Sequence, residues 1–392
     1  MYALKRELKL NNREVSQMRG LAGFKRLVYN FGWYMVQASW EFDGIKASDS
    51  RRIDAIKQVF TQVVMKAPEN AWMKQYPSTV YQGAFIDLKE AFSRWRQGLA
   101  DFPKKKTRKK GDSFRVYKTS GVYPEKGKPA LPFTNRVVIN PGKRIKLPGL
   151  KEFRLKERID FTCSSQTFTV SRMADKWFVS FVLDVDKIPP LMHPMATIGV
   201  DLGVKTLATC SDGTVYHLPT ATKRAKTKLS KLQWRHRHQV KGSKKLKLRA
   251  SANARKFYMR LARLHARIAN IRRDTTQKMT TDLSRKAKII RLEDLNVAGM
   301  LANHKLASAI SDHCFYEIRR QLTYKQSHYG TRVELVDRWY PSSKTCSQCN
   351  QVQPMKLSDR VFRCSHCGQV QCRDLNAALN LERAPSDQVR LA

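Results

Sequence analysis

The chain has 392 residues and carries 75 lysines and arginines against 32 aspartates and glutamates, a formal net charge of +43 at neutral pH. Soluble domains usually carry a net charge of about 2 to 8 in magnitude, and a polyanion relieves the self-repulsion of so many like charges, so nucleic acid is the expected partner. Hydrophobic residues make up 42% of the sequence, which excludes a wholly disordered chain. At roughly 100–200 residues per domain, the length predicts two to four domains.

The N-terminal residues show no sign of secretion or membrane insertion. Charged side chains occupy part of residues 1–11, where a signal peptide would have its apolar stretch. The most apolar window, residues 27–40, is interrupted by polar residues and is shorter than the roughly 18 apolar residues of a membrane span. We therefore expect a cytoplasmic protein that does not bind membranes.

Residues 15–100 follow a helical pattern. Apolar side chains recur at spacings of three, four and three, which places them on one helix face: Phe85, Leu88, Phe92 and Trp95. The segment 102–111 ends this pattern with a proline, six basic residues and a glycine, a composition typical of a cationic loop. The candidates for nucleic-acid contacts in this loop are Lys104, Lys105 and Arg108.

Short β-rich runs follow between residues 113 and 189. They are separated by turn signals such as Asn140-Pro-Gly142, and they lie at residues 136–139, 160–170 and 177–185. This pattern predicts a small β-barrel or an open sheet.

A third region begins near residue 197 and has the pattern of an α/β sheet. Three consecutive strands are predicted at residues 197–201, 207–210 and 215–218, joined by hairpin turns. Two further strands are predicted at residues 287–292 and 332–336, with a helical run over 309–329 between them.

A basic helical insertion interrupts this third region. Residues 223–273 contain 19 lysines and arginines and no acid, so the segment holds no internal partner for its charge. Basic runs are often solvated faces, but this one favours an external polyanion, and Lys244 and Lys245 are candidate contacts. An apolar seam recurs at spacings of four and three through the insertion: Phe257, Leu261, Leu264, Ile268 and Ile271.

Four of the 8 cysteines form two CxxC pairs near the C-terminus. The pairs are separated by 14 residues, and Gly368 follows the second: Cys346, Cys349, Cys364 and Cys367. In a long intracellular chain this spacing predicts one structural zinc ion held by four thiolates, with no open coordination position. The alternatives are reduced buried cysteines or a redox pair.

Three acids stand at the ends of predicted elements. Asp201 ends one strand, Glu293 follows another, and Asp374 precedes a helical run at 375–380. If the two strands are neighbours, the first two acids converge at one sheet edge and the helix can bring the third across it. Such a cluster can hold two Mg²⁺ ions for phosphodiester hydrolysis. The alternatives are solvated strand ends and a helix cap at Asp374.

Three motifs containing these acids resemble the three RuvC motifs of the TnpB family, and the double CxxC lies between the last two. They are Ile198-Gly-Val-Asp-Leu-Gly-Val-Lys-Thr-Leu207, Ile290-Arg-Leu-Glu-Asp-Leu-Asn296 and Arg373-Asp-Leu-Asn-Ala-Ala-Leu-Asn380. Weaker likenesses occur at 308–330, 340–346 and 102–115. The resemblance is specific over residues 197–382. The chain departs from it at Gln371-Cys372, where members often have an acid in the second position.

TnpB proteins are transposon-encoded, RNA-guided DNA nucleases related to Cas12 effectors. The resemblance implies an α+β multidomain protein with an RNase H-like (RuvC) nuclease domain. It assigns residues 1–14 to a first wedge strand, 15–110 to a helical recognition lobe and 111–190 to a β-barrel wedge domain. Residues 191–340 then form the nuclease domain with the 223–273 insertion, 341–370 a zinc ribbon that binds target nucleic acid, and 371–392 the RuvC C-terminal part and tail.

The resemblance also implies the site residues. Asp201, Glu293 and Asp374 become catalytic ligands of two Mg²⁺ ions, and the four CxxC cysteines become zinc ligands. Gln82 and Thr119 fall where members read a short target-adjacent motif, although each could be an ordinary surface residue. Arg373 either contacts the scissile phosphate or pairs with a neighbouring acid.

The expected function is RNA-guided, Mg²⁺-dependent cleavage of both strands of double-stranded DNA by one RuvC site. The expected partners are a guide RNA and a target DNA, and the expected protein is a prokaryotic monomer acting at the nucleoid. A binding-only RNA-guided repressor would be expected to have lost one of the three acids. An unguided RuvC-type transposase or resolvase would lack bound RNA.

Overall fold

The computed structural model describes residues 2–41, 48–108, 111–117, 137–183, 192–238, 242, 248–304, 307–356 and 359–392. Three predicted contact residues, Thr119, Lys244 and Lys245, lie outside these ranges. The chain divides into two compact units, Met1–Asp186 and Lys187–Ala392, which are considered separately. None of the helices in the described ranges has the length and apolar character to span a membrane.

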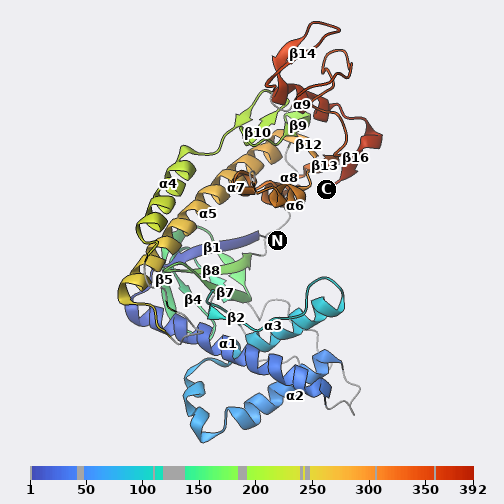
Figure 1. Cartoon of the computed structure of the whole chain (residues 1–392). Coiled ribbons are helices and arrows are strands. Elements are labelled where there is room, and N and C mark those ends of the chain that lie inside the picture. Colours follow the sequence, from blue (N-terminus) through green and yellow to red (C-terminus); the bar gives the residue numbers. More distant parts are fainter. Residues whose placement is uncertain are drawn as a thin grey trace. The chain divides into compact units, whose positions relative to one another are not determined.

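The helices of the first unit form the predicted helical module (Figure 1). They are α1 (Asn12–Glu41), α2 (Asp49–Val59), the π-helix η1 (Phe60–Val64), the 3₁₀-helix η2 (Pro68–Gln75) and α3 (Ser78–Arg96). Phe85, Leu88 and Phe92 on the predicted face of α3 are fully buried. Gly32 of α1 allows the close approach of α3, because a Cβ atom there would lie 2.7 Å from Leu88 Cδ2.

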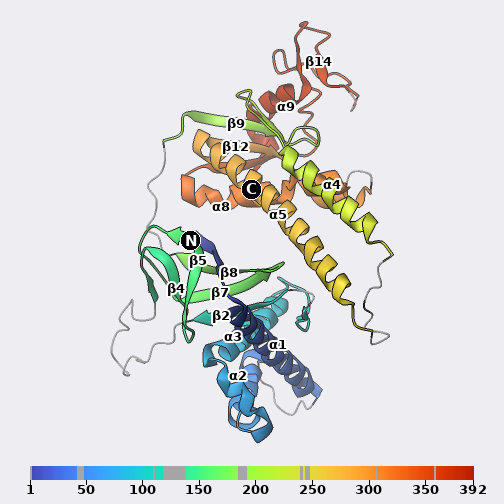
Figure 2. The same cartoon turned by 90° about the vertical axis from the view of Figure 1, so that its left-hand side faces the viewer.

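The first unit also contains a six-stranded antiparallel sheet (Figure 2). Its order is β2 (Ser113–Tyr117), β7 (Thr167–Met173), β8 (Lys176–Leu183), β1 (Tyr2–Leu8), β5 (Glu152–Ile159) and β4 (Gly142–Lys146). The N-terminal strand β1 pairs with β8 on one side and with β5 on the other. A short separate ladder joins β3 (Val137–Ile139) to β6 (Cys163–Ser165).

The predicted β-barrel is not found in the described residues, where this sheet is open. Its end strands, β2 and β4, do not pair with each other. Helix α3 packs against β2 instead, so closely that a Cβ atom on Gly83 would lie 3.0 Å from the Arg115 carbonyl oxygen. The first unit is therefore a helical layer packed on one end of an open sheet.

The second unit is built on a mixed sheet of six strands. The order is β11 (Val215–Tyr216), β10 (Ala208–Cys210), β9 (Met195–Asp201), β12 (Ala287–Glu293), β13 (Arg332–Val336) and β16 (Val389–Leu391). Strands β9, β12 and β13 run parallel, and the others pair antiparallel. Alternate apolar side chains of the parallel strands share one face of the sheet and are fully buried there: Ile198, Val200, Ile290, Leu292, Val333 and Leu335.

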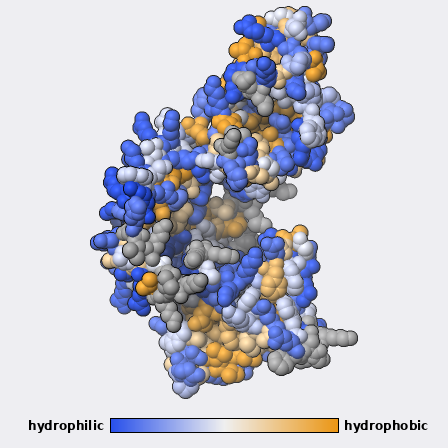
Figure 3. All heavy atoms as spheres, in the orientation of Figure 1, coloured by the Kyte–Doolittle hydropathy of each residue, from blue (hydrophilic) through white to orange (hydrophobic). Residues whose placement is uncertain are grey.

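The basic insertion forms two packed helices, α4 (Thr220–Arg235) and α5 (Ala252–Lys286). The predicted seam is confirmed, because Phe257 and Ile268 are buried and the other seam residues are partly buried. Figure 3 shows a mostly hydrophilic surface over α4. Helix α5 extends beyond the predicted insertion and leads directly into β12, so its last turns belong to the core of the unit.

The helical run predicted over residues 309–329 is found, divided between two helices. The chain forms α6 (Val297–Ala302), α7 (Ala307–His313) and α8 (Phe315–Tyr329), and Cys314 breaks the last two apart with a left-handed φ of 55°. Lys226 of α4 and Arg272 of α5 both bind the carboxylate of Asp312. These ion pairs hold α7 against α4 and α5, the two helices of the basic insertion. Helical periodicity in the sequence does not reveal such a long-range contact.

The C-terminal segment completes the second unit with a small ribbon and one helix. The ribbon contains β14 (Val361–Arg363) paired with β15 (Val370–Cys372), which leads into α9 (Arg373–Glu382). A 3₁₀ turn, η4 (Ser386–Gln388), precedes β16. Helix α9 packs against β9 and β12, so it covers the part of the sheet where two of the predicted acids lie.

Candidate active site and metal centre

Asp201 and Glu293 end two neighbouring parallel strands. The register pairs Val200 of β9 with Leu292 of β12, and each acid is the next residue of its strand. Parallel strands end at the same sheet edge, so both carboxyl groups emerge there, as the sequence predicts. Both side chains are only partly exposed.

Helix α9 brings Asp374 to the same edge. Gly199 of β9 makes this approach possible, because a Cβ atom there would lie 2.0 Å from the Ala378 carbonyl oxygen and 2.5 Å from the Glu382 nitrogen. The Thr206 hydroxyl donates to Asp374 Oδ2 at 3.5 Å, which links the helix to the loop after β9. At the other end, the Arg291 guanidinium donates to the carbonyl oxygens of Glu382 and Ala384.

Asp201 lies close enough to the other two acids to be influenced by their charges. Burial, the largest cause, together with the charges of Asp374 and Glu293, raises the pKa of Asp201 from its ordinary value of 3.8 to about 7. Burial also raises the pKa of Glu293. Arg373 opposes both shifts with its positive charge. A site of this kind stores electrostatic repulsion that a bound cation would relieve.

The carboxylates form a donor set suited to a hard divalent cation such as Mg²⁺, which prefers oxygen ligands. The three acids do not form a tight cluster of ligand atoms like that of the cysteines. Within the described ranges, the one group of three or more such atoms all within 4.8 Å of one another is made of cysteine sulfurs. The residue types and the shared edge fit a divalent cation.

The raised pKa of Asp201 predicts a pH-dependent stability for metal-free protein. An acid whose pKa is higher in the folded state binds more protons there, so the free energy of unfolding falls as pH rises from about 4 to about 7. Asp201→Asn removes this titration, so in EDTA it should flatten the dependence of the melting temperature on pH. The control is Asp274→Asn, an exposed acid one turn from Lys278, which should keep the wild-type slope. Equal slopes for wild type and Asp201→Asn would contradict the assignment.

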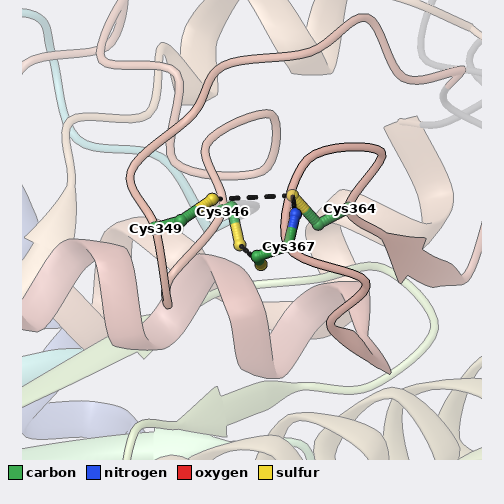
Figure 4. Close-up of side chains that lie close together, drawn as sticks. All are labelled: Cys346, Cys349, Cys364 and Cys367. Carbon is green, nitrogen blue, oxygen red and sulfur yellow. Dashed lines mark hydrogen bonds between the residues drawn. The ribbon is translucent and has the colours of Figure 1, made fainter.

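The four predicted cysteines converge at a second centre (Figure 4). The sulfur atoms of Cys346 and Cys367 lie 3.6 Å apart, as do those of Cys349 and Cys364, and all four lie within 4.8 Å of one another. A disulfide would need an S–S distance of about 2.05 Å, whereas tetrahedral zinc with bonds of about 2.3 Å separates its sulfurs by roughly 3.8 Å. The cluster therefore fits one structural zinc ion. Its sulfur atoms are too far apart for disulfides and too close together for unrelated free cysteines.

The two CxxC turns share one backbone geometry. The residue after each pair has a left-handed φ, 61° at Asn350 and 74° at Gly368. Its N–H donates to the carbonyl oxygen of the first cysteine, at 2.9 Å and 3.2 Å respectively. The N–H of Cys367 also donates to Cys364 Sγ at 3.5 Å, and such hydrogen bonds lower the pKa of that thiol to about 6. Gly368 was expected to allow a tight turn, and Asn350 does the same in the first pair.

Two buried asparagines of α9 join the cysteine centre to the acidic edge. Asn376 donates to the Thr345 carbonyl oxygen at 2.7 Å and accepts from the Ser347 N–H at 3.0 Å. Asn380, one turn later, donates to the carbonyl oxygens of Ser342 and Thr345. Sequence reasoning missed both residues, although amides four positions apart in an otherwise apolar helix are a signal of a buried polar face. Helix α9, which carries Asp374, is therefore held by hydrogen bonds to the backbone around the first cysteine pair.

The other predicted contact residues have partners within their own units. Gln82 accepts from the Tyr117 hydroxyl at 2.5 Å, and Lys105 donates to the Tyr34 hydroxyl at 3.2 Å. Lys104 lies 3.9 Å from Asp101, and Arg108 is exposed. The Arg373 guanidinium donates to the Asp359 carbonyl oxygen at 3.4 Å in addition to its influence on the acids.

Asp294, next to Glu293, was missed as a site residue. It is 5% exposed and accepts hydrogen bonds from three arginines of three different elements: Arg319 at 3.0 Å, Arg338 at 2.9 Å and Arg390 at 2.5 Å. Burial raises the pKa of Asp294, but these guanidinium groups outweigh burial and hold its pKa below the ordinary value. The arginines are separated by up to 71 residues of sequence, so no local pattern connects them.

Comparisons with known proteins concern the family and the fold of the chain. A family model described as "Probable transposase" matches residues 180–304, and one described as "Cas12f1-like, TNB domain" matches residues 315–381. Among solved structures, a Cas12f1–sgRNA–target DNA complex matches with a TM-score of 0.54 over 95% of this chain and 83% of that one. At 14% identity this likeness concerns the fold, and it confirms the predicted α+β class.

Similar sequences extend over nearly the whole chain. A Streptomyces pristinaespiralis protein named "Putative RNA-guided DNA endonuclease" is 31% identical over 94% of this chain and 85% of its own length. The Escherichia coli protein InsQ, named in the same way, is 31% identical over 97% of this chain and 91% of its own length. The TnpB-like protein L79 of Acanthamoeba polyphaga mimivirus is 32% identical over 33% of this chain and 26% of its own length. The motif resemblance is thereby confirmed, and the chain belongs to the TnpB family.

Proposed function

We propose that this chain is an RNA-guided, Mg²⁺-dependent endonuclease that cuts both strands of guide-complementary DNA at one site. The observation that carries the proposal is the meeting of Asp201, Glu293 and Asp374 from three separate elements at one sheet edge, in a member of the TnpB family. Retention of all three acids favours a nuclease over a binding-only repressor.

The topology of the second unit supports assignment of an RNase H-like, RuvC-type domain. Counted along the chain, its first five strands lie in the order third, second, first, fourth, fifth, with the fourth and fifth parallel to the first. The acids end the first and fourth strands, and the helix that crosses them supplies the third acid. Three elements distant in sequence thus aim carboxyl groups at one place.

The proposed reaction is hydrolysis of a phosphodiester bond. When bound, two Mg²⁺ ions would supply an activated water and stabilise the leaving 3′ oxygen. Asp201, Glu293 and Asp374 would hold the cations, and the Thr206 hydroxyl orients Asp374 through its hydrogen bond. Arg373 reduces the repulsion among the acids and is suitably placed to contact a phosphate.

The proposed nucleic-acid contacts follow from the positive charge of the basic insertion, residues 223–273, and of the cationic loop, residues 102–111. Exposed cations on α4 face no acid within their own segment: Lys223, Arg224, Lys228, Lys231 and Arg235. Contacts of this kind grip a phosphate backbone without reading bases, so the sequence of the target has to be read by a paired RNA strand. The remaining proposed contacts are Lys104, Lys105, Arg108 and Gln82, together with three residues outside the described ranges, Thr119, Lys244 and Lys245.

Exchange of the guide tests the proposed function. The purified chain should carry RNA with a structured part and a variable end, and replacing the variable end should move the cut to the newly complementary DNA. The motif beside the target should stay unchanged, because the protein reads it. Sequencing of the bound RNA and mapping of the cut ends are the measurements. Cutting by RNA-free protein, or unchanged targeting after the exchange, would favour an unguided nuclease.

A further inference from the structure

The three arginines around Asp294 form a cluster of guanidinium groups beside a proposed catalytic acid. Asp294 neutralises one of the three charges, and the arginine side chains remain 42%, 42% and 64% exposed at Arg319, Arg338 and Arg390. One buried carboxylate therefore fixes the positions of three guanidinium groups whose remaining donors face solvent. Such fixed, partly exposed guanidinium groups are suited to phosphate oxygens.

A cavity extends from this arginine cluster to Glu293, one of the three proposed catalytic acids. It has a volume of about 340 Å³, and its lining includes Glu293, Asp294 and all three arginines. This volume lies at the lower end of the range of roughly 300–1,000 Å³ found for small-ligand sites. A second hollow of about 210 Å³ lies on the other side of Arg338 and Arg390. The cluster is thus reachable from the side where Glu293 lies.

Two exposed aromatic residues accompany the cluster. Tyr316 lines the same cavity and is 68% exposed, and Trp339, which follows Arg338 directly, is 84% exposed. Large aromatic side chains with this exposure bury little surface in the hydrophobic core, so they contribute little to the stability of the unit. Aromatic rings beside fixed cations are the combination with which proteins hold single-stranded nucleic acid, since bases stack on rings and phosphates bind the cations.

We propose that Arg319, Arg338 and Arg390, organised by Asp294 and accompanied by Tyr316 and Trp339, bind the DNA strand that enters the active site, through phosphates next to the one that is cut. This inference rests on the proposed function and adds the site that positions its substrate. A strand bound this way would have its bases unpaired and stacked, so the chain would cut single strands drawn from an opened duplex.

Cross-linking to a single-stranded DNA oligonucleotide that contains 5-iodouracil tests the site. The full chain is used in EDTA, so no cutting is needed. The expected products join the DNA to peptides containing Tyr316 or Trp339, and Trp339→Ala should weaken binding on the order of tenfold. Cross-links confined to other segments, or cross-linking that bound guide RNA does not alter but an unlabelled single-stranded DNA fails to compete away, would overturn the inference.

Salt dependence separates phosphate binding from a purely structural role. Arg390→Gln should lower the slope of log Kd against log salt by about 0.7, the contribution of one phosphate contact on a single strand, whereas Arg390→Lys should keep it. The matched control is Arg320→Gln, since Arg320 is 51% exposed, lies next to Arg319 on α8, pairs with Glu317 and does not line the cavity. Equal slopes for all four proteins would overturn the inference. A chain that cross-links as expected and never cuts DNA would overturn the proposed function alone.

Discussion

Replacing any one of the three acids with its amide should abolish DNA cleavage and leave target binding largely intact. Asp201→Asn, Glu293→Gln and Asp374→Asn each remove one negative oxygen donor from the shared edge of β9, β12 and α9. Losing a single preorganised group that stabilises developing charge costs on the order of 10²–10³ in rate, and a cation ligand should cost at least as much. Single-turnover cleavage in Mg²⁺ and gel-shift binding in EDTA measure the two effects separately.

The control for this series is Asp274→Asn, which removes an exposed acid of α5 paired with Lys278 and should cut at the wild-type rate. Near wild-type cutting by one of the three amide variants would show that its acid is not a cation ligand. A parallel loss of binding would mean that the variant disturbs the fold, because none of the three acids belongs to the proposed nucleic-acid contacts.

Cys349→Ser should release zinc and with it most of the cleavage activity. Wild-type protein should contain one zinc ion per chain, since four sulfurs within 4.8 Å of one another match one tetrahedral site. Zinc in small ribbons contributes roughly 10–16 kcal/mol of apparent binding energy, which is also folding energy for the segment around it. Loss of the metal should loosen the peptide that Asn376 and Asn380 hold, and so displace Asp374. Elemental analysis and cleavage assays measure both steps.

Two variants sharpen the zinc experiment. Cys372→Ser alters an exposed cysteine outside the cluster, five residues from Cys367, and should keep both zinc and activity. Asn376→Leu removes the hydrogen bonds between α9 and the backbone of Thr345 and Ser347 but leaves all four cysteines in place. This variant should therefore keep zinc and lose cleavage. Zinc-free wild-type protein would refute the metal assignment, and full activity of Asn376→Leu would refute the coupling between the two centres.

Local patterns predicted the elements that carry the site. Strand 332–336 is found with the predicted bounds, and the strands that end at Asp201 and Glu293 differ by a few residues at most. These successes share a cause, because alternation, continuous apolar runs and CxxC spacing depend on residues near one another in the chain. The division of the helical run at Cys314, where the backbone φ is left-handed, was not predicted, because helical periodicity does not mark it.

By itself the sequence identified the family and predicted the partner class, the cysteine ligand set and the three acids, since charge balance, spacing and motif order are properties of the linear chain. The tertiary structure alone decided that the first sheet is open within its described residues, that Asn376 and Asn380 join the cysteine centre to Asp374, and that one buried aspartate gathers three arginines beside Glu293. Each of these depends on residues far apart in sequence, which meet only because the apolar strands of each unit are buried together in that unit's own core.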